Sequence, residues 1–137
     1  MIIFYDASCP LCNTEMQHLK DADTKHKIVL EDLNSHDFSA RYPSVNKNKA
    51  MAILHAQLPT GEMIYGLDVT YQAWKTVGKY RWLKIFRLPI IRYFADAAYM
   101  FFAKHRQKIS RLLMPNASCL NGQCTVNTKD KQWKQLF

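Results

Sequence analysis

Two cysteines stand three positions apart near the start of the chain, in the segment Asp6-Ala7-Ser8-Cys9-Pro10-Leu11-Cys12. Residues 1–5 are continuously apolar, which is typical of a strand buried on both faces. Pro10 suits the first position of a helix, because its missing N–H would have no partner there. Cys9 therefore directly precedes the helix, where free backbone N–H groups and the helix dipole stabilise a thiolate. The pattern predicts that Cys9 is the attacking sulfur in thiol-disulfide exchange.

Cys12 and Asp6 are the other two residues expected to be catalytic. Cys12 lies one turn beyond Cys9, on the apolar face of a helix predicted over residues 10–22. We therefore expect Cys12 to be mostly buried and to displace the product from a mixed disulfide on Cys9. Asp6 can accept the proton of Cys12 in that step, or it can bond nearby backbone N–H groups as a turn residue. The sequence leaves both roles of Asp6 open.

Two other interpretations of the cysteine pair remain. The first is a non-enzymatic zinc-binding or protein-interaction module that uses Cys9, Cys12, Cys119 and Cys124 as thiolate ligands. The second is a pair of cysteines packed in a core without any chemistry. The strand-to-helix corner favours redox chemistry, because zinc knuckles usually lie on turns of short hairpins, whereas thioredoxin-like dithiols lie at such corners.

A known family shares this motif. The pattern Asp6-x-x-Cys9-Pro10-Leu11-Cys12 resembles the DCC family of predicted thiol-disulfide oxidoreductases, which is named for its Asp-Cys-Cys motif. A second similarity to the family lies in Tyr80-Arg81-Trp82-Leu83, Leu88-Pro89, Arg92, Ala95-Asp96 and Tyr99. The resemblance spans about residues 1–113 and implies a thioredoxin-like fold with dithiol chemistry. It does not name the substrate, and we expect no cofactor.

The elements that must position the cysteines are those of an α/β protein, a thioredoxin-like sheet flanked by helices with a C-terminal helical extension. Apolar runs predict strands over residues 1–5, 28–32, 51–56 and 62–65. Asp68 is expected to cap a helix that follows the last strand. Thioredoxin-like proteins usually carry a cis-proline before the third strand, where this chain has Ala50 and Met51. We divide the chain into a DCC-type domain, residues 1–113, and a cysteine-containing tail, residues 114–137.

The helical extension is predicted from about Tyr80 to Leu113 and contains an amphipathic helix that begins at Pro89. Its apolar stripe is expected to pack in the core and consists of Ile90, Ile91, Phe94, Ala97, Ala98, Phe101, Phe102 and His105. Arg92 and Asp96 can pair on the opposite face. Charged residues in the apolar window exclude a membrane span, but the aromatic stripe allows weak contact with a membrane surface.

Cys119 and Cys124 form the second cysteine pair of the chain. The turn formers Asn121 and Gly122 between them allow the chain to reverse, so the two cysteines are predicted to be accessory thiols that can form a disulfide. One hypothesis is that this tail reaches the Cys9–Cys12 site and relays electrons. The alternative is that they are two unrelated surface thiols.

Composition limits the class of protein. The chain has 137 residues, of which 48% are hydrophobic, enough for one compact domain with a core. The net charge of +8 comes from scattered basic residues without a nucleic-acid-binding module, so we expect a solvated basic surface and no specific nucleic acid. The N-terminus shows no secretory signal, which predicts a cytoplasmic protein with a reduced dithiol. The expected substrate is a disulfide-containing protein or a small thiol, and the oligomeric state is left open.

Overall fold

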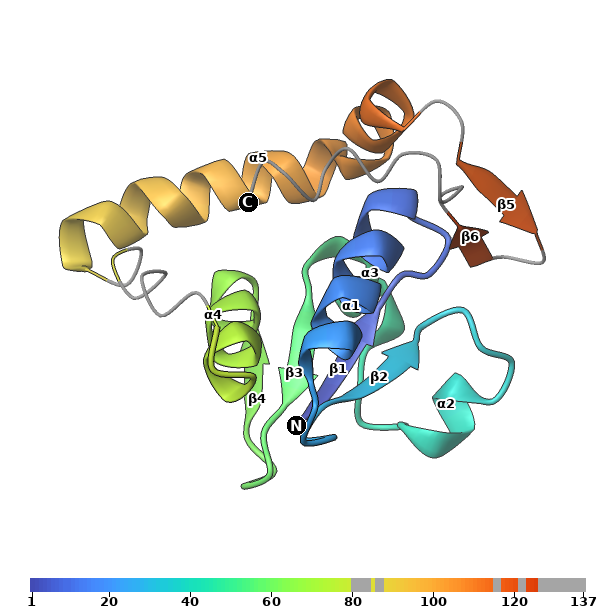
Figure 1. The fold of residues 1–137 in the computed structure, drawn as a ribbon, viewed down its shortest axis with the longest axis horizontal. Helices are drawn as coiled ribbons and strands as arrows, with labels where there is room; N and C mark the ends of the chain where they lie inside the picture. The colour runs from blue at the N-terminus through green and yellow to red at the C-terminus, as the bar shows by residue number, and fades with distance from the viewer. Residues whose placement is uncertain (80–84, 86–87, 115–116, 121–122, 126–137) are drawn as a thin grey trace.

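The computed structural model describes residues 1–79, 85, 88–114, 117–120 and 123–125, without the side chains of 118–120, 123 and 125. The strands are β1 (Ile2–Tyr5), β2 (Val29–Asp32), β3 (His55–Gln57), β4 (Met63–Tyr65), β5 (Ser118–Leu120) and β6 (Gln123–Thr125). The helices are α1 (Pro10–Ala22), α2 (Phe38–Arg41), α3 (Lys47–Ala52), α4 (Leu67–Thr76) and α5 (Pro89–Leu113). Figure 1 shows the long helix α5 lying across one end of the sheet and its helices, with the β5–β6 hairpin beside it.

The central sheet has the strand order β2-β1-β3-β4. Strand β1 runs parallel to β2 and antiparallel to β3, and β3 pairs with β4 in antiparallel register. This mixed sheet with flanking helices and a C-terminal helix confirms the predicted thioredoxin-like fold class. Strand β1 is central, so its carboxyl end at Tyr5 delivers Asp6 and the two cysteines to one edge of the sheet.

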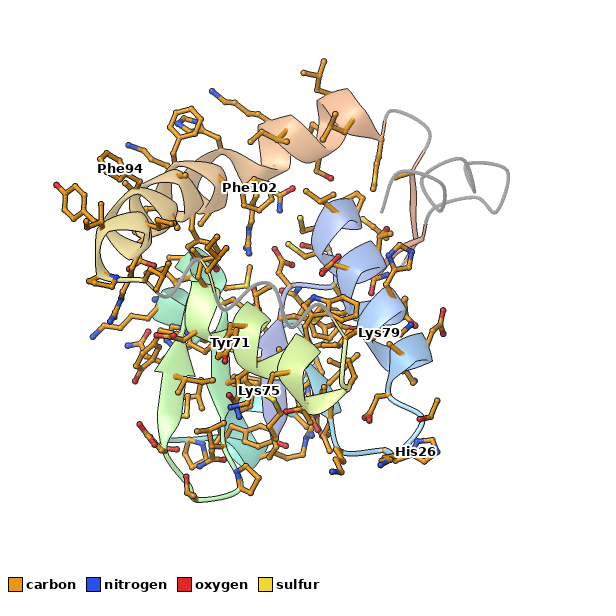
Figure 2. The ribbon with its side chains drawn as sticks, turned by 60° about the vertical axis from the view of Figure 1, so that its left-hand side comes forward. His26, Tyr71, Lys75, Lys79, Phe94 and Phe102 are labelled. Atoms are coloured by element: carbon orange, nitrogen blue, oxygen red, sulfur yellow. The ribbon has the colours of Figure 1, made fainter. Side chains whose placement is uncertain are left out.

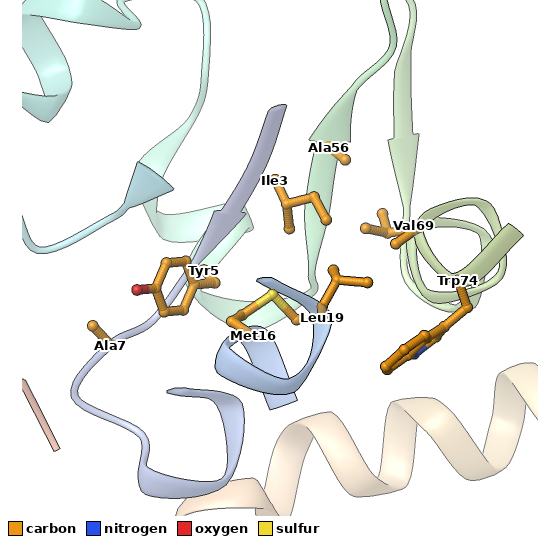
Figure 3. Close-up of a cluster of buried hydrophobic side chains, with 9 residues drawn as sticks. Ile3, Tyr5, Ala7, Met16, Leu19, Ala56, Val69 and Trp74 are labelled. Atoms are coloured by element: carbon orange, nitrogen blue, oxygen red, sulfur yellow. The ribbon is translucent and has the colours of Figure 1, made fainter. Parts of the chain in front are cut away.

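Alternation along β1 builds a core on each face of the sheet. Ile3 and Tyr5 face α1 and α4, where they pack in a cluster that also includes Met16, Leu19, Ala56, Val69, Ala73 and Trp74 (Figure 3). Phe4 faces the other way and packs against Phe38 and Tyr42, at ring-centroid distances of 5.8 and 5.0 Å. Both faces of the strand that leads into the cysteine pair are therefore anchored.

The region before β3 differs from the prediction. Residues 47–52 form helix α3, so the strand predicted over 51–56 is wrong in its first half and begins at His55. The Asn46 side chain accepts a hydrogen bond from Lys49 N at 3.0 Å, which is an N-cap that turns the polar segment into a helix. Ala50 and Met51 pack in the core beside Phe4, and the described residues contain no cis peptide bond.

Helix α4 also starts differently from the prediction. Its N-cap is Gly66, so Asp68 lies in the first turn and is not the cap. Gly66 has φ 59° and ψ −131°, a conformation that suits glycine, and Tyr99 of α5 lies against it. The Tyr99 hydroxyl accepts a hydrogen bond from Leu54 N at 3.1 Å. This contact docks the middle of α5 on the sheet.

The apolar stripe of α5 is only partly in the core. Ile90, Phe94 and Phe101 are 76%, 69% and 66% exposed, so the expectation of core packing is wrong for this outward face. Figure 2 shows Phe94 at the end of α5 that extends beyond the sheet. The inward face includes Phe102 of the predicted stripe together with Tyr99, Ala103 and Arg106, which the stripe did not include. Within the part of the chain that the structure describes, no helix has the length and apolar character needed to cross a membrane.

Replacing Gly66 by alanine tests the docking of α5. A Cβ at this position would lie 3.3 Å from Tyr99 Cε1, and the backbone would keep a φ that alanine rarely adopts. We expect Gly66→Ala to lower the free energy of unfolding by about 1–3 kcal/mol, measured by urea denaturation. Gly61→Ala is the matched control, because Gly61 has φ 87° but no atom within 4 Å of the added Cβ. Equal losses in both variants would contradict a packing role for Gly66.

Candidate active site

Cys9 occupies the N-cap position of α1. Its carbonyl accepts the hydrogen bond of Asn13 N at 2.9 Å, so the helix begins directly after it. The pKa of Cys9 is lowered to about 6, chiefly by the hydrogen bond that the Cys12 thiol donates to it. The backbone N–H of Cys12 and the positive charge of Arg106 lower it further, against the opposing effects of burial and of Asp6.

Cys12 shows the opposite behaviour. Its pKa is raised, because its thiol is the donor to Cys9, because it is buried, and because the Cys9 thiolate repels a second negative charge. The two sulfurs thus share one proton, which stays on Cys12 while Cys9 carries the charge. A low pKa at Cys9 and a protonated Cys12 are what an attacking and a resolving cysteine would need, and the two roles stay predictions.

The two cysteines differ in exposure. Cys12 is mostly buried, as predicted, but Cys9 is 0% exposed and is more buried still. The sequence did not predict this complete burial of Cys9. The reason lies outside the motif: strand β6 packs against α1, and residues of the β5–β6 hairpin contact the loop that carries Cys9.

Asp6 lies at the centre of a polar network at the carboxyl end of β1. Its side chain is completely buried, and its Oδ1 accepts hydrogen bonds from the backbone N–H and hydroxyl of Ser8 and from Asn34 Nδ2. Its Oδ2 forms an ion pair with Arg106 at 3.0 Å and accepts a weaker hydrogen bond from Gln107. Both oxygens are therefore engaged, so Asp6 bonds the nearby backbone as the turn interpretation predicted and also holds a cation.

Arg106 is the functional residue that sequence reasoning missed. One of its guanidinium nitrogens, Nη2, donates to Asp6 and to the carbonyl of Met51 at 2.7 Å, and the other, Nη1, lies 3.9 Å from Cys12 Sγ. Its side chain is 13% exposed. Arg106 follows Tyr99 by two helical turns on the inward face of α5, and this periodicity was the available signal. It also donates a hydrogen bond to the backbone at Met51, at the end of α3.

A cavity of about 330 Å³ adjoins the cysteine pair on the side of Cys12. It lies between α1, α4 and α5, and its walls are mainly apolar and aromatic, including Met16, Leu54, Trp74, Tyr99 and Phe102. The polar groups on its lining include Asp6, Glu15, Thr70 and Arg106. Cys12 lines this cavity, so a molecule held in it would lie against the sulfur that shares a proton with Cys9.

The hairpin brings Cys124 to the other side of the motif. Cys124 N donates to Ala7 O at 3.0 Å, and the carbonyl of Cys124 accepts a hydrogen bond from the Asn13 side chain. Cys124 is 2% exposed and disulfide-bonded, and its sulfur lies 3.0 Å from the carbonyl oxygen of Ser8. Cys119 is its partner in the backbone register of β5 and β6, but the Cys119 side chain and the predicted turn at 121–122 lie outside the described residues. The predicted Cys119–Cys124 bond therefore stays a prediction.

The described residues give no support to the alternative zinc site. Cys9 and Cys12 are free thiols, but the sulfur of Cys124 is in a disulfide and is not a thiolate ligand. Among the described residues, no group of three or more His, Cys, Asp or Glu side chains is placed to hold a metal ion. The donor set that a structural zinc requires is thus not assembled around this motif.

Comparisons with known proteins agree with the geometry of the site. Residues 3–112 match the model of the DCC1-like thiol-disulfide oxidoreductase family. An uncharacterised chloroplastic protein of Arabidopsis thaliana is 27% identical over 110 residues, which cover 79% of this chain and 51% of that protein. The chain thus spans about half the length of this relative, and a comparison with solved structures gives no match. The match over most of the chain shows that the protein belongs to the DCC1-like thiol-disulfide oxidoreductase family.

Proposed function

We propose that the chain is a thiol-disulfide oxidoreductase in which Cys9 attacks and Cys12 resolves. The observation that carries this proposal is the division of one proton between the two sulfurs, with a Cys9 pKa of about 6 and a raised Cys12 pKa. At neutral pH a thiol with an ordinary pKa of about 8.5 is mostly protonated, whereas Cys9 is mostly thiolate. Cys9 is therefore the better nucleophile of the pair.

The first step forms a bond between Cys9 Sγ and one sulfur of a substrate disulfide, while the S–S bond of the substrate breaks. The released substrate sulfur leaves as a thiolate and takes a proton from solvent. Cys9 is now neutral and no longer accepts the proton of Cys12. The largest causes of the raised Cys12 pKa are lost with this change, because they are the hydrogen bond to Cys9 and the charge on Cys9.

The second step uses Cys12 as the nucleophile. Arg106 Nη1 lies 3.9 Å from Cys12 Sγ and favours its thiolate once the proton has left to solvent. Cys12 Sγ then attacks Cys9 Sγ, the mixed disulfide breaks, and the second substrate thiol is released. Asp6 orients Arg106 in this scheme, since both oxygens of its carboxylate already accept hydrogen bonds.

The cavity beside Cys12 supports a substrate with an apolar group next to its disulfide. Its volume of about 330 Å³ is near the lower end of the range for small-molecule sites, roughly 300–1,000 Å³. A small disulfide or one apolar side chain of a protein substrate fits this size. We include a cytoplasmic location in the proposal, where the Cys9–Cys12 pair would rest as the dithiol.

Trapping of the mixed disulfide tests the function. Cys12→Ser removes the resolving sulfur. In a chain that also lacks the hairpin cysteines, Cys119→Ser/Cys124→Ser, we expect this variant to accumulate a covalent adduct on Cys9 when it is mixed with 5,5′-dithiobis(2-nitrobenzoate). In the same background, Cys9→Ser lacks the low-pKa thiolate, so we expect its remaining thiol, Cys12, to form the adduct much more slowly at neutral pH. Mass spectrometry of the intact protein and its peptides measures both outcomes. Equal adduct formation in the two variants would refute the assigned order.

A further inference from the structure

The β5–β6 hairpin places a second disulfide against the loop of the proposed nucleophile, in a part of the chain that the family match over residues 3–112 does not include. Figure 1 shows the hairpin at the end of α1 where the helix begins. Backbone hydrogen bonding of Cys124 to Ala7 and the Asn13 side chain holds β6 there. This docking places the Cys124 sulfur against the peptide group that joins Ser8 to Cys9.

The burial of Cys9 and Cys124 affects which groups Cys9 can react with. Cys9 is 0% exposed and Cys124 is 2% exposed, so both sulfurs are shielded from solvent in the same region. A buried thiolate reacts first with groups that already lie close to it, because an external substrate must first displace the residues that shield the thiolate from solvent. The Cys124 sulfur lies 3.0 Å from the carbonyl oxygen of Ser8, so its disulfide adjoins the peptide group that joins Ser8 to Cys9. We propose that Cys9 exchanges with this disulfide, so that the hairpin is an internal redox partner of the Cys9–Cys12 pair.

The exchange balances within the chain and rests on the function proposed above. The Cys9 thiolate attacks Cys124 Sγ, forms a Cys9–Cys124 bond and releases the partner sulfur of Cys124 as a thiolate. The partner is assigned to Cys119, which faces Cys124 in the hairpin register while Cys9 and Cys12 are free. Cys12 Sγ then attacks Cys9 Sγ and releases Cys124. The pair Cys9–Cys12 becomes oxidised, and the hairpin becomes a dithiol.

The contact with Ser8 suits both redox states of Cys124. In the disulfide the sulfur carries no proton, so its 3.0 Å approach to Ser8 O is a close sulfur–oxygen contact. After reduction the same sulfur is a thiol and can donate a hydrogen bond to that oxygen. The reduced hairpin therefore keeps a partner for its new donor, and the relay does not leave a buried thiol unsatisfied.

The test uses Cys12→Ser in the full chain, isolated with the hairpin disulfide intact and without added disulfide. We expect peptide mapping under non-reducing conditions to show a Cys9–Cys124 link and a free Cys119 thiol. Cys12→Ser/Cys124→Ser should lose the linked peptide completely, because it lacks the attacked sulfur. Cys12→Ser/Cys119→Ser should also lose it, because Cys124 then has no disulfide to exchange.

An intact hairpin disulfide in Cys12→Ser that still traps the external disulfide would refute the relay and leave the proposed function standing. A Cys9–Cys119 link would refute the assignment of Cys124 as the attacked sulfur. Failure to trap either partner would refute the proposed function itself.

Discussion

Arg106→Met is expected to lower the free energy of unfolding by about 3–5 kcal/mol, the loss typical of removing one partner of a buried ion pair. The Asp6 side chain is completely buried, and in the variant it loses the guanidinium that lies 3.0 Å away. The hydrogen bond from Arg106 to Met51 O is lost as well. Methionine keeps most of the apolar stem, so the loss reports the charge and the hydrogen bonds more than the packing.

Arg92→Met is the matched control for this measurement. Arg92 lies on the same helix and pairs with Asp96 at 3.4 Å, but both side chains of that pair are about half exposed. We expect Arg92→Met to lower the free energy of unfolding by less than about 1 kcal/mol, as for other exposed ion pairs. Urea denaturation of both variants gives the comparison. Arg106→Lys replaces Arg106→Met in the comparison if the methionine variant does not fold. Lysine keeps the positive charge but lacks the planar guanidinium, so we expect a loss of stability between those of Arg106→Met and Arg92→Met. Similar small losses at both positions would contradict the buried role of Arg106.

The elements nearest the motif were the most predictable from the sequence. The helix predicted over residues 10–22 has the observed bounds of α1, because Pro10 marks its first position and the apolar face repeats at helical spacing. The strand before it and the parallel strand β2 also follow from short apolar runs. The family, and with it the type of chemistry, could be predicted because the motif lies at this local corner, whereas the roles of the two sulfurs stay predictions.

Features that depend on distant parts of the chain were not predictable in the same way. Arg106 reaches Asp6 from α5, whose strongest sequence signal is an apolar stripe that the structure turns outward at Phe94 and Phe101. The burial of Cys9 comes from the hairpin near the other end of the chain. Neither contact could be predicted from a pattern in the nearby sequence, because each joins residues that are far apart in the chain.

Ultraviolet absorbance of the thiolate is expected to show Cys9 titrating with a midpoint near pH 6, far below an ordinary thiol. Below this pH Cys9 is protonated, and its rate of exchange falls about tenfold for each pH unit, whereas above it the rate levels off. At pH 7 about 90% of Cys9 is thiolate, compared with about 3% for a thiol of pKa 8.5. The absorbance needs no reagent to reach Cys9, so its burial does not obscure the titration.

The pH dependence of the free energy of unfolding gives a second, independent measure of the lowered Cys9 pKa in the reduced protein. The folded pKa of Cys9 is lower than the unfolded one, so its stabilisation is complete above about pH 8.5 and is lost as the pH falls through about 6. We expect the stability of the reduced protein relative to Cys9→Ala to decrease by about 3 kcal/mol across this interval. The raised pKa of Cys12 acts only at higher pH, where the unfolded chain begins to lose its second proton.

Cys12→Ala decides whether the neighbouring thiol causes the shift. The hydrogen bond from Cys12 is the largest cause of the lowered Cys9 pKa, so its removal should move the absorbance midpoint upward by about one to two pH units. Cys12→Ser keeps a hydroxyl donor at the same position and should move it less. The backbone N–H of Cys12 and the charge of Arg106 remain in both variants and preserve part of the shift. An unchanged midpoint in Cys12→Ala would assign the low pKa to the helix N-terminus and Arg106 instead, and the proton shared between the two sulfurs would no longer explain their order of reaction.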